Sequence, residues 1–211
     1  MRLKIANRIS RRSYALFLTA ALLVPGISSA AIVSGEVTAS GGTAGDITLG
    51  VTVDDIITRF TITWVENRWA GISFGPTPAH DGGYMIIAKL DGTADEYNAR
   101  TDHTGRPIKQ APPDQDLTVE SFTTGGGVSE IVLSRLSNTG DFNDFWFEAV
   151  EQFIPTQWSI GWEGDLEIDA GHEVRGYFDP DLHLVPVPAA MPLLVSGLFA
   201  LGLIARRKKT A

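Results

Sequence analysis

Two short stretches, Ile47-Thr48-Leu49-Gly50-Val51-Thr52-Val53 and Phe60-Thr61-Ile62-Thr63-Trp64, decide the fold class. In each stretch an apolar residue occupies every second position, and Thr or Gly occupies the positions between. A period of two residues with β-branched and aromatic side chains is typical of a strand that buries one face. The sequence therefore predicts a strand over each stretch.

The same pattern recurs along the middle of the chain, in Trp69–Phe74, Tyr84–Leu90, Leu117–Phe122, Val128–Leu136, Phe145–Ala149, Gln157–Trp162 and His172–Phe178. Turn-forming residues separate these runs, among them Asp91-Gly92 and Gly125-Gly126-Gly127. Residues 102–116 are rich in Pro and Gly and predict a long loop. No ten-residue stretch has a helical period, so the sequence predicts an all-β domain built as a two-sheet β-sandwich.

The N-terminus has the layout of an export signal. Five basic residues precede an apolar run at 14–24, and Ser28-Ser29-Ala30 forms a small-residue cleavage site. This predicts a signal peptide over 1–30. The Arg11-Arg12 pair leaves twin-arginine export open, while an N-terminal membrane helix is disfavoured because the apolar run is too short to span a bilayer.

The C-terminus has the layout of a sorting tail. Val185-Pro186-Val187-Pro188-Ala189 precedes an apolar run at 189–205 and four basic residues at 206–209. The segment 185–211 resembles the bacterial PEP-CTERM sorting signals in their Val-Pro-x-Pro-Ala variant. The resemblance implies a transmembrane segment at 189–205, recognition by an exosortase-type transpeptidase and cleavage near the prolines. A plain C-terminal membrane anchor is the alternative.

These ends predict a protein exported to the periplasm or surface of a Gram-negative bacterium and held in the membrane at least transiently. The domain between them, 31–184, is strongly acidic. All 25 Asp and Glu residues lie between the two predicted signals, with only eight of the 17 Lys and Arg, a net charge of −17. Such a charge argues against nucleic acid as a partner. The absence of Cys excludes disulfides and thiolate chemistry.

Two of the four histidines are candidates for chemistry. His172 opens an alternating strand on which it is expected to share an apolar face with Val174 and Phe178, and His80 lies in the loop before the strand that begins at Tyr84. His103 and His183 are expected to be exposed and without function.

Four stretches resemble DOMON domains over about residues 32–180. They are Trp69-Ala70-Gly71-Ile72-Ser73-Phe74-Gly75, Arg135-Leu136 with Thr139-Gly140-Asp141, Trp158-Ser159-Ile160-Gly161, and His172-Glu173-Val174-Arg175-Gly176. The resemblance implies an immunoglobulin-like β-sandwich that binds either haem b or sugars. It implies His172 as one axial haem ligand and places His80 near the other ligand position, with Met85 as the fallback. The implied pocket includes Trp69, Phe74 and Tyr84. Bis-imidazole ligation favours electron transfer or redox sensing, with a redox partner protein, rather than catalysis.

The alternatives are a haem-free module that binds extracellular polysaccharide or matrix, and a purely structural matrix protein. Five tryptophans, Trp64, Trp69, Trp146, Trp158 and Trp162, are candidate stacking platforms, although aromatic residues in strands usually belong to the core. Trp158 and Trp162 share a predicted face with Ile160, which favours the core for both. The acidic turns around Asp141 and Asp165 lack the spacing of calcium loops, and no hydrolase motif is present.

Overall fold

The computed structural model describes residues 31–75, 83–101, 107–111, 114–141, 144–165 and 171–187. These residues form strands and their connections, with one short 3-10 turn, η1 (Gly42–Ala44). Within these ranges no helix is long and apolar enough to cross a membrane. The predicted signal peptide 1–30 and membrane segment 189–205 lie outside the described residues.

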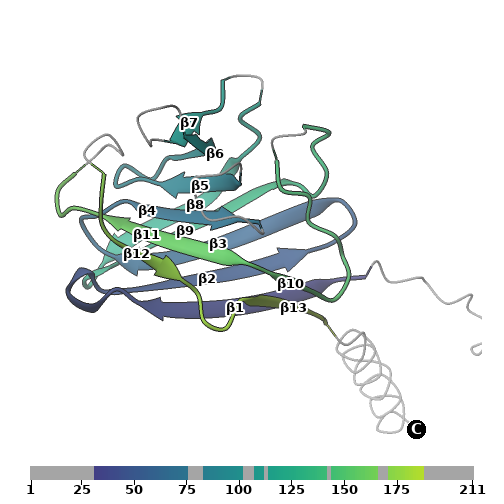
Figure 1. Ribbon diagram of the computed structural model, residues 1–211, viewed down its shortest axis with the longest axis horizontal. Helices are drawn as coiled ribbons and strands as arrows, with labels where there is room; N and C mark the ends of the chain where they lie inside the picture. Colours follow the sequence, from purple (N-terminus) through teal and green to yellow (C-terminus); the bar gives the residue numbers. More distant parts are fainter. Residues whose placement is uncertain are drawn as a thin grey trace, which may run out of the picture.

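The strands form two antiparallel sheets that lie one over the other (Figure 1). The seven-stranded sheet has the order β10-β13-β1-β2-β3-β9-β8, where β1 is Val33–Ser40, β2 Asp46–Val53, β3 Ile57–Val65, β8 Thr118–Gly125, β9 Val128–Leu136, β10 Gln152–Ile154 and β13 Leu182–Pro186. The six-stranded sheet has the order β12-β11-β4-β5-β6-β7, where β4 is Ala70–Phe74, β5 Tyr84–Ala88, β6 Ala94–Thr101, β7 Pro107–Lys109, β11 Thr156–Gly161 and β12 His172–Tyr177. The predicted all-β, two-sheet architecture is confirmed.

The main core fills the space between the sheets. It contains every apolar residue of the two alternating stretches that run from Ile47 to Val53 and from Phe60 to Trp64. The register of β2 on β3 pairs Leu49 with Ile62 and Val51 with Phe60, so the two apolar sets face the same side. The period of two in the sequence therefore gives the buried face of this sheet directly.

The six-stranded sheet also buries its outer face at its centre. Every residue of β4 and β5 is buried, and Trp69, Met85, Ile87 and Tyr97 form a second apolar cluster apart from the main core. Even-numbered residues of β4 and β5 face the main core, and odd-numbered residues face this second cluster.

The predicted strand over Phe145–Ala149 is wrong. Residues 144–150 form a connection without strand pairing, although Phe147 is buried in the main core. The backbone is held instead by one side chain and one backbone hydrogen bond: Arg135 donates to the Phe145 carbonyl, and the Phe147 N–H donates to the Ser137 carbonyl. The predicted loop 102–116 also contains a short edge strand, β7.

The sandwich has two distinct ends. We call the end where β1 begins and β13 stops the tail end, because the Val187 N–H donates to the Ile32 carbonyl at 2.7 Å there. The far end carries η1, the β8–β9 turn, the connection from Val65 to Ala70, and the start of β12. The end of the sandwich nearest the predicted membrane segment is thus separate from the end that holds His172.

Candidate functional site

The residues of the predicted haem site fall at different places in the fold. Trp69 and His172 lie at the far end, whereas Phe74 and Tyr84 lie at the tail end of the six-stranded sheet. Phe74 and Tyr84 belong to the main core, while Trp69 and Met85 belong to the cluster on the outer face. His80 lies outside the described residues. The described members of the set therefore do not line one pocket.

Met85 and His172 are too far apart to ligate one iron atom. Across the sheet, Met85 pairs with Ser73, Ser73 pairs with Gln157, and Gln157 pairs with Tyr177. Tyr177 lies five residues after His172 in β12. Three strand spacings also separate β5 from β12. At about 4.8 Å per strand and about 3.3 Å per residue, their Cα atoms are about 20 Å apart. The fallback ligand pair therefore does not fit a single haem.

At the far end, Trp69 packs directly on Gly161. The Gly161 N–H donates to the Trp69 carbonyl at 3.0 Å, and a Cβ atom at Gly161 would stand 2.1 Å from the indole Nε1. Only glycine allows this close approach, because any side chain would overlap the ring. His172 is the ladder partner of Gly161, so Trp69 and His172 lie on either side of this glycine.

A β-bulge changes the expected orientation of His172. The register pairs Gly161 with His172 and Ile160 with Val174, which leaves Glu173 as the extra residue. An extra residue interrupts the two-residue alternation, so the inference that His172 and Val174 share a face does not hold across the bulge. His172 is half-buried. Arg68 fixes the bulge by donating to Glu173 and, at 3.0 Å, to the Gly161 carbonyl.

Trp162 is an exposed aromatic residue beside this cluster. The sequence favours the core for Trp158 and Trp162 together; Trp158 is buried, but Trp162 is 49 % exposed. The strand ends at Gly161, so its alternation no longer governs residue 162. A turn follows, in which the Gly164 N–H donates to the Asn67 carbonyl at 2.8 Å. An exposed indole is thus held on an anchored turn.

The buried Trp69 indole has an unusual polar atom. Its Nε1 has no hydrogen-bond partner among the described residues, although the residue is only 2 % exposed. Buried indole N–H groups normally find an acceptor. The far end therefore combines an unpaired buried donor with Trp162 and His172.

The tail end instead holds a buried polar network that the sequence analysis missed. The Tyr84 hydroxyl donates to Glu96 at 2.5 Å, and Arg135 forms an ion pair with Asp144 at 2.9 Å and lies over the Tyr84 ring. Thr139 also donates to Asp144 at 2.8 Å. Arg135 and Thr139 of the DOMON-like stretch therefore hold the chain around Asp144.

Burial raises the pKa of Glu96 and raises that of Tyr84 well above its ordinary value. The sequence pattern predicts no strand over Ala94–Thr101, so nothing in it marks Glu96 as a residue that faces the core. Because its side chain accepts hydrogen bonds from Tyr84 and from the Asp116 and Leu117 N–H groups, Glu96 joins three parts of the chain. This role is structural, and it leaves the far end as the candidate binding site.

No protein-family model matches the chain, and no curated protein matches it. Within the part of the chain that the structure describes, no group of three or more His, Asp or Glu side chains is placed to hold a metal ion.

Proposed function

We propose that this chain is an exported, membrane-tethered binding module with an immunoglobulin-like sandwich of the DOMON type, and that its far end binds a neutral extracellular polysaccharide. The observation that carries the proposal is Trp162, half-exposed on a fixed turn next to His172 and Trp69. An exposed indole offers a flat apolar face with a polar edge. Such a face suits the apolar side of a sugar ring.

The polar surroundings of Trp162 support a sugar ligand. Glu163 and Asp165 belong to the same turn, and Asn67 is joined to it through the backbone. Carboxylate and amide groups accept hydrogen bonds from sugar hydroxyls. The net charge of −17 on the mature domain disfavours anionic polymers, so the polysaccharide class is neutral.

The predicted topology agrees with this placement. A membrane segment at 189–205 follows Val187 at the tail end, and an anchored sandwich would then turn its far end outward. An exosortase-type transpeptidase acting near Pro186 and Pro188 would release or transfer the domain without changing the far end.

The test is affinity electrophoresis of the detergent-solubilised full chain in gels that contain neutral or anionic polysaccharides. We expect retardation by neutral polymers, and we expect Trp162→Ala to weaken binding about tenfold or more, as for other exposed aromatic contacts. Trp146→Ala is the matched control, since Trp146 is also an exposed tryptophan, 60 % against 49 % for Trp162, and lies at the opposite end. Equal loss in both variants, or no retardation by any neutral polymer, would reject the site.

Haem b ligation by His80 and His172 is the second proposal; it rests on the DOMON resemblance and on the half-buried His172, which Gly161 separates from Trp69. β4 ends and β5 begins at the tail end, so the chain segment that contains His80 joins the sheet at the end opposite His172. A haem group there would supply one-electron chemistry, and His172 would be one of the residues that hold it. The visible absorption spectrum tests it. A Soret band with sharp α and β bands after reduction, lost in His172→Ala, would support haem. A featureless spectrum after addition of hemin would exclude it and leave the polysaccharide proposal.

A further inference from the structure

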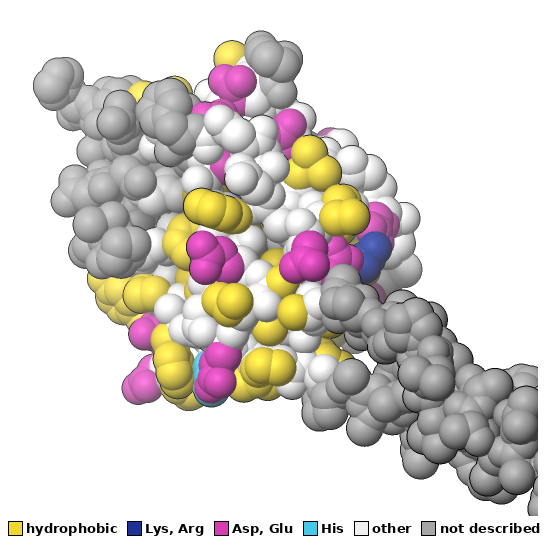
Figure 2. Space-filling model, turned by 90° about the vertical axis from the view of Figure 1, so that its right-hand side faces the viewer, with side chains coloured by type: hydrophobic (Ala, Val, Ile, Leu, Met, Phe, Trp, Pro, Cys, Tyr) yellow, Lys and Arg dark blue, Asp and Glu magenta, His cyan; other side chains and the backbone are white. Residues whose placement is uncertain are grey.

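Exposed apolar side chains gather at the tail end of the sandwich. Six of them, on five different segments, are Ile56, Leu136, Trp146, Val150, Phe153 and Val187. Figure 2 shows this end, with hydrophobic side chains interspersed with Asp and Glu side chains. We call these six residues the apolar rim. Their exposure is large, reaching 60 % for Trp146 and 67 % for Phe153.

The rim differs from the rest of the seven-stranded sheet surface. The outward positions of β1, β2 and β3 carry mainly hydroxyl side chains, such as Thr38, Thr48 and Thr61. Apolar exposure is thus concentrated at one end of this sheet. Exposed apolar residues that gather at one end among polar side chains mark a surface that meets another apolar phase or partner.

The position of the chain end indicates what covers the rim. The described chain stops at Val187, which is bonded to Ile32 at the tail end, and the predicted membrane segment begins at Ala189. Two residues span at most about 7 Å. The polar headgroup layer on each side of a bilayer is about 5–8 Å thick. A membrane segment starting at Ala189 therefore brings the rim to the headgroup layer.

We propose that the apolar rim docks on a bilayer of zwitterionic phospholipids, with Trp146 and Phe153 inserted among the headgroups. The proposal rests on the predicted C-terminal membrane segment of the proposed function. Aromatic side chains favour this interfacial layer because their rings are apolar and their edges are polar.

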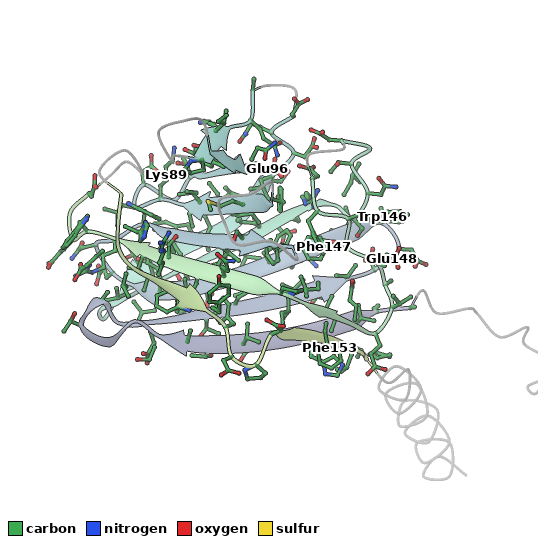
Figure 3. The ribbon with its side chains drawn as sticks, in the orientation of Figure 1. Lys89, Glu96, Trp146, Phe147, Glu148 and Phe153 are labelled. Atoms are coloured by element: carbon green, nitrogen blue, oxygen red, sulfur yellow. The ribbon has the colours of Figure 1, made fainter. Side chains whose placement is uncertain are left out.

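The acidic residues of this end select the lipid class. Glu148 and Glu151 lie in the same connection as Trp146 and Val150. Figure 3 places Trp146, Glu148 and Phe153 on the same side of the molecule. Carboxylates pair with the ammonium groups of zwitterionic headgroups but are repelled by anionic lipids, whose surface potential is negative. The rim therefore fits a neutral membrane surface better than an anionic one.

Phe153 is held in its exposed position by contacts on the protein side. Its ring stacks on the His183 ring with centroids 3.9 Å apart, and His183 bonds to Glu151 at 3.0 Å. His183, expected to be idle, instead supports an exposed aromatic residue. A side chain that is already fixed loses little conformational entropy when it inserts.

The experiment uses tryptophan fluorescence of the full chain in phosphatidylcholine vesicles whose acyl chains carry bromine, a contact quencher. Trp146 and Trp162 are the exposed tryptophans at the two ends, and Trp64, Trp69 and Trp158 are buried. We expect bromolipid to quench part of the emission. Trp146→Phe should abolish the quenched part, and Trp162→Phe should leave it in place.

A second pair of variants keeps Trp146 as the fluorescent reporter and changes the surface around it, so it tests whether the apolar rim docks on the membrane. Phe153→Asp places a charge on the rim and should reduce quenching of Trp146 at least twofold. Val128→Asp, at an exposed apolar position of the far end, should not. Replacing phosphatidylcholine with anionic lipid should also reduce quenching of Trp146.

Vesicle flotation separates the two ways in which the proposal fails. A chain that does not float with the vesicles lacks the predicted membrane anchor, which overturns both the tether and the docking. A chain that floats while Trp146 is quenched no more than Trp162 is anchored, but its rim does not touch the membrane. Quenching of Trp146 that is stronger in anionic vesicles would overturn the assignment of lipid class.

Discussion

Gly161 shows how one missing Cβ organises the far end. The Trp69 indole occupies the space where a Gly161 side chain would stand, at 2.1 Å from Nε1. The same glycine donates its N–H to Trp69, accepts from Arg68 and pairs with His172. The position of Trp69 and the register at His172 therefore both depend on a residue that contributes no side-chain contact.

We predict that Gly161→Ala destabilises the protein by about 1–3 kcal/mol, because the ring of Trp69 must move to admit the methyl group. In a domain of this size the change lowers Tm by several degrees, on the order of 2–4 °C per kcal/mol. Thermal unfolding followed by circular dichroism measures it. Gly50→Ala is the matched control, since its Cβ would meet Thr61 at an ordinary 3.7 Å. Similar losses in both variants would contradict the role of Gly161.

The raised pKa of Glu96 leads us to predict that the free energy of unfolding depends on pH. Burial raises its pKa in the folded state above that in the unfolded chain, so the folded state binds the proton more tightly. Its contribution to stability is therefore fully present below the unfolded pKa, about 4.3. It is lost as pH rises through the raised folded pKa.

The measurement is urea unfolding of the wild type and Glu96→Gln from pH 4 to pH 8. The free energy of unfolding of the wild type minus that of the variant should fall as pH rises. Gln retains an acceptor for the Tyr84 hydroxyl but does not titrate. A difference that stays constant or grows with pH would show that Glu96 does not have a raised pKa.

At the scale of elements, the connection 144–150 shows where a period of two misleads. Phe145 and Phe147 both pack against the main core, as alternate residues of a strand would, but no neighbouring strand pairs with them. Phe147 instead inserts its ring between those of Phe60, Phe74 and Phe145, with centroids 5.3, 5.1 and 4.9 Å away. The alternation there reflects side-chain packing over the sandwich rather than a hydrogen-bonded ladder.

We predict that Phe147→Ala destabilises the protein by about 3–5 kcal/mol, because it leaves a cavity inside this aromatic group. Trp146→Ala should cost much less, since Trp146 is 60 % exposed while Phe147 is 1 % exposed. Urea unfolding of the two adjacent variants makes the comparison. Equal losses of unfolding free energy in the two variants would show that the buried Phe147 stabilises the core no more than the exposed Trp146 does.

At the scale of the whole molecule, the two ends of the sandwich have different surfaces. The tail end carries the apolar rim and both ends of the described chain, while the far end carries Trp162, His172 and polar turns. Because the strands run from one end to the other, the sandwich can be held on a membrane at the tail end and bind a polysaccharide at the far end. The polysaccharide and membrane proposals therefore use separate residues and can be tested independently.

The all-β class and most of the buried face could be predicted from the amino-acid sequence alone, because the two-residue period of side chains in a strand is a local property. Ile47 to Val53 and Phe60 to Trp64 needed no tertiary information to be assigned to the core. The other features follow only from the three-dimensional arrangement of the strands. The bulge at Glu173, the exposure of Trp162, the separation of Met85 from His172 and the network around Glu96 all depend on which strands are neighbours and where each ladder stops. Strand order and register bring together residues that are distant in sequence, and no local pattern encodes that pairing.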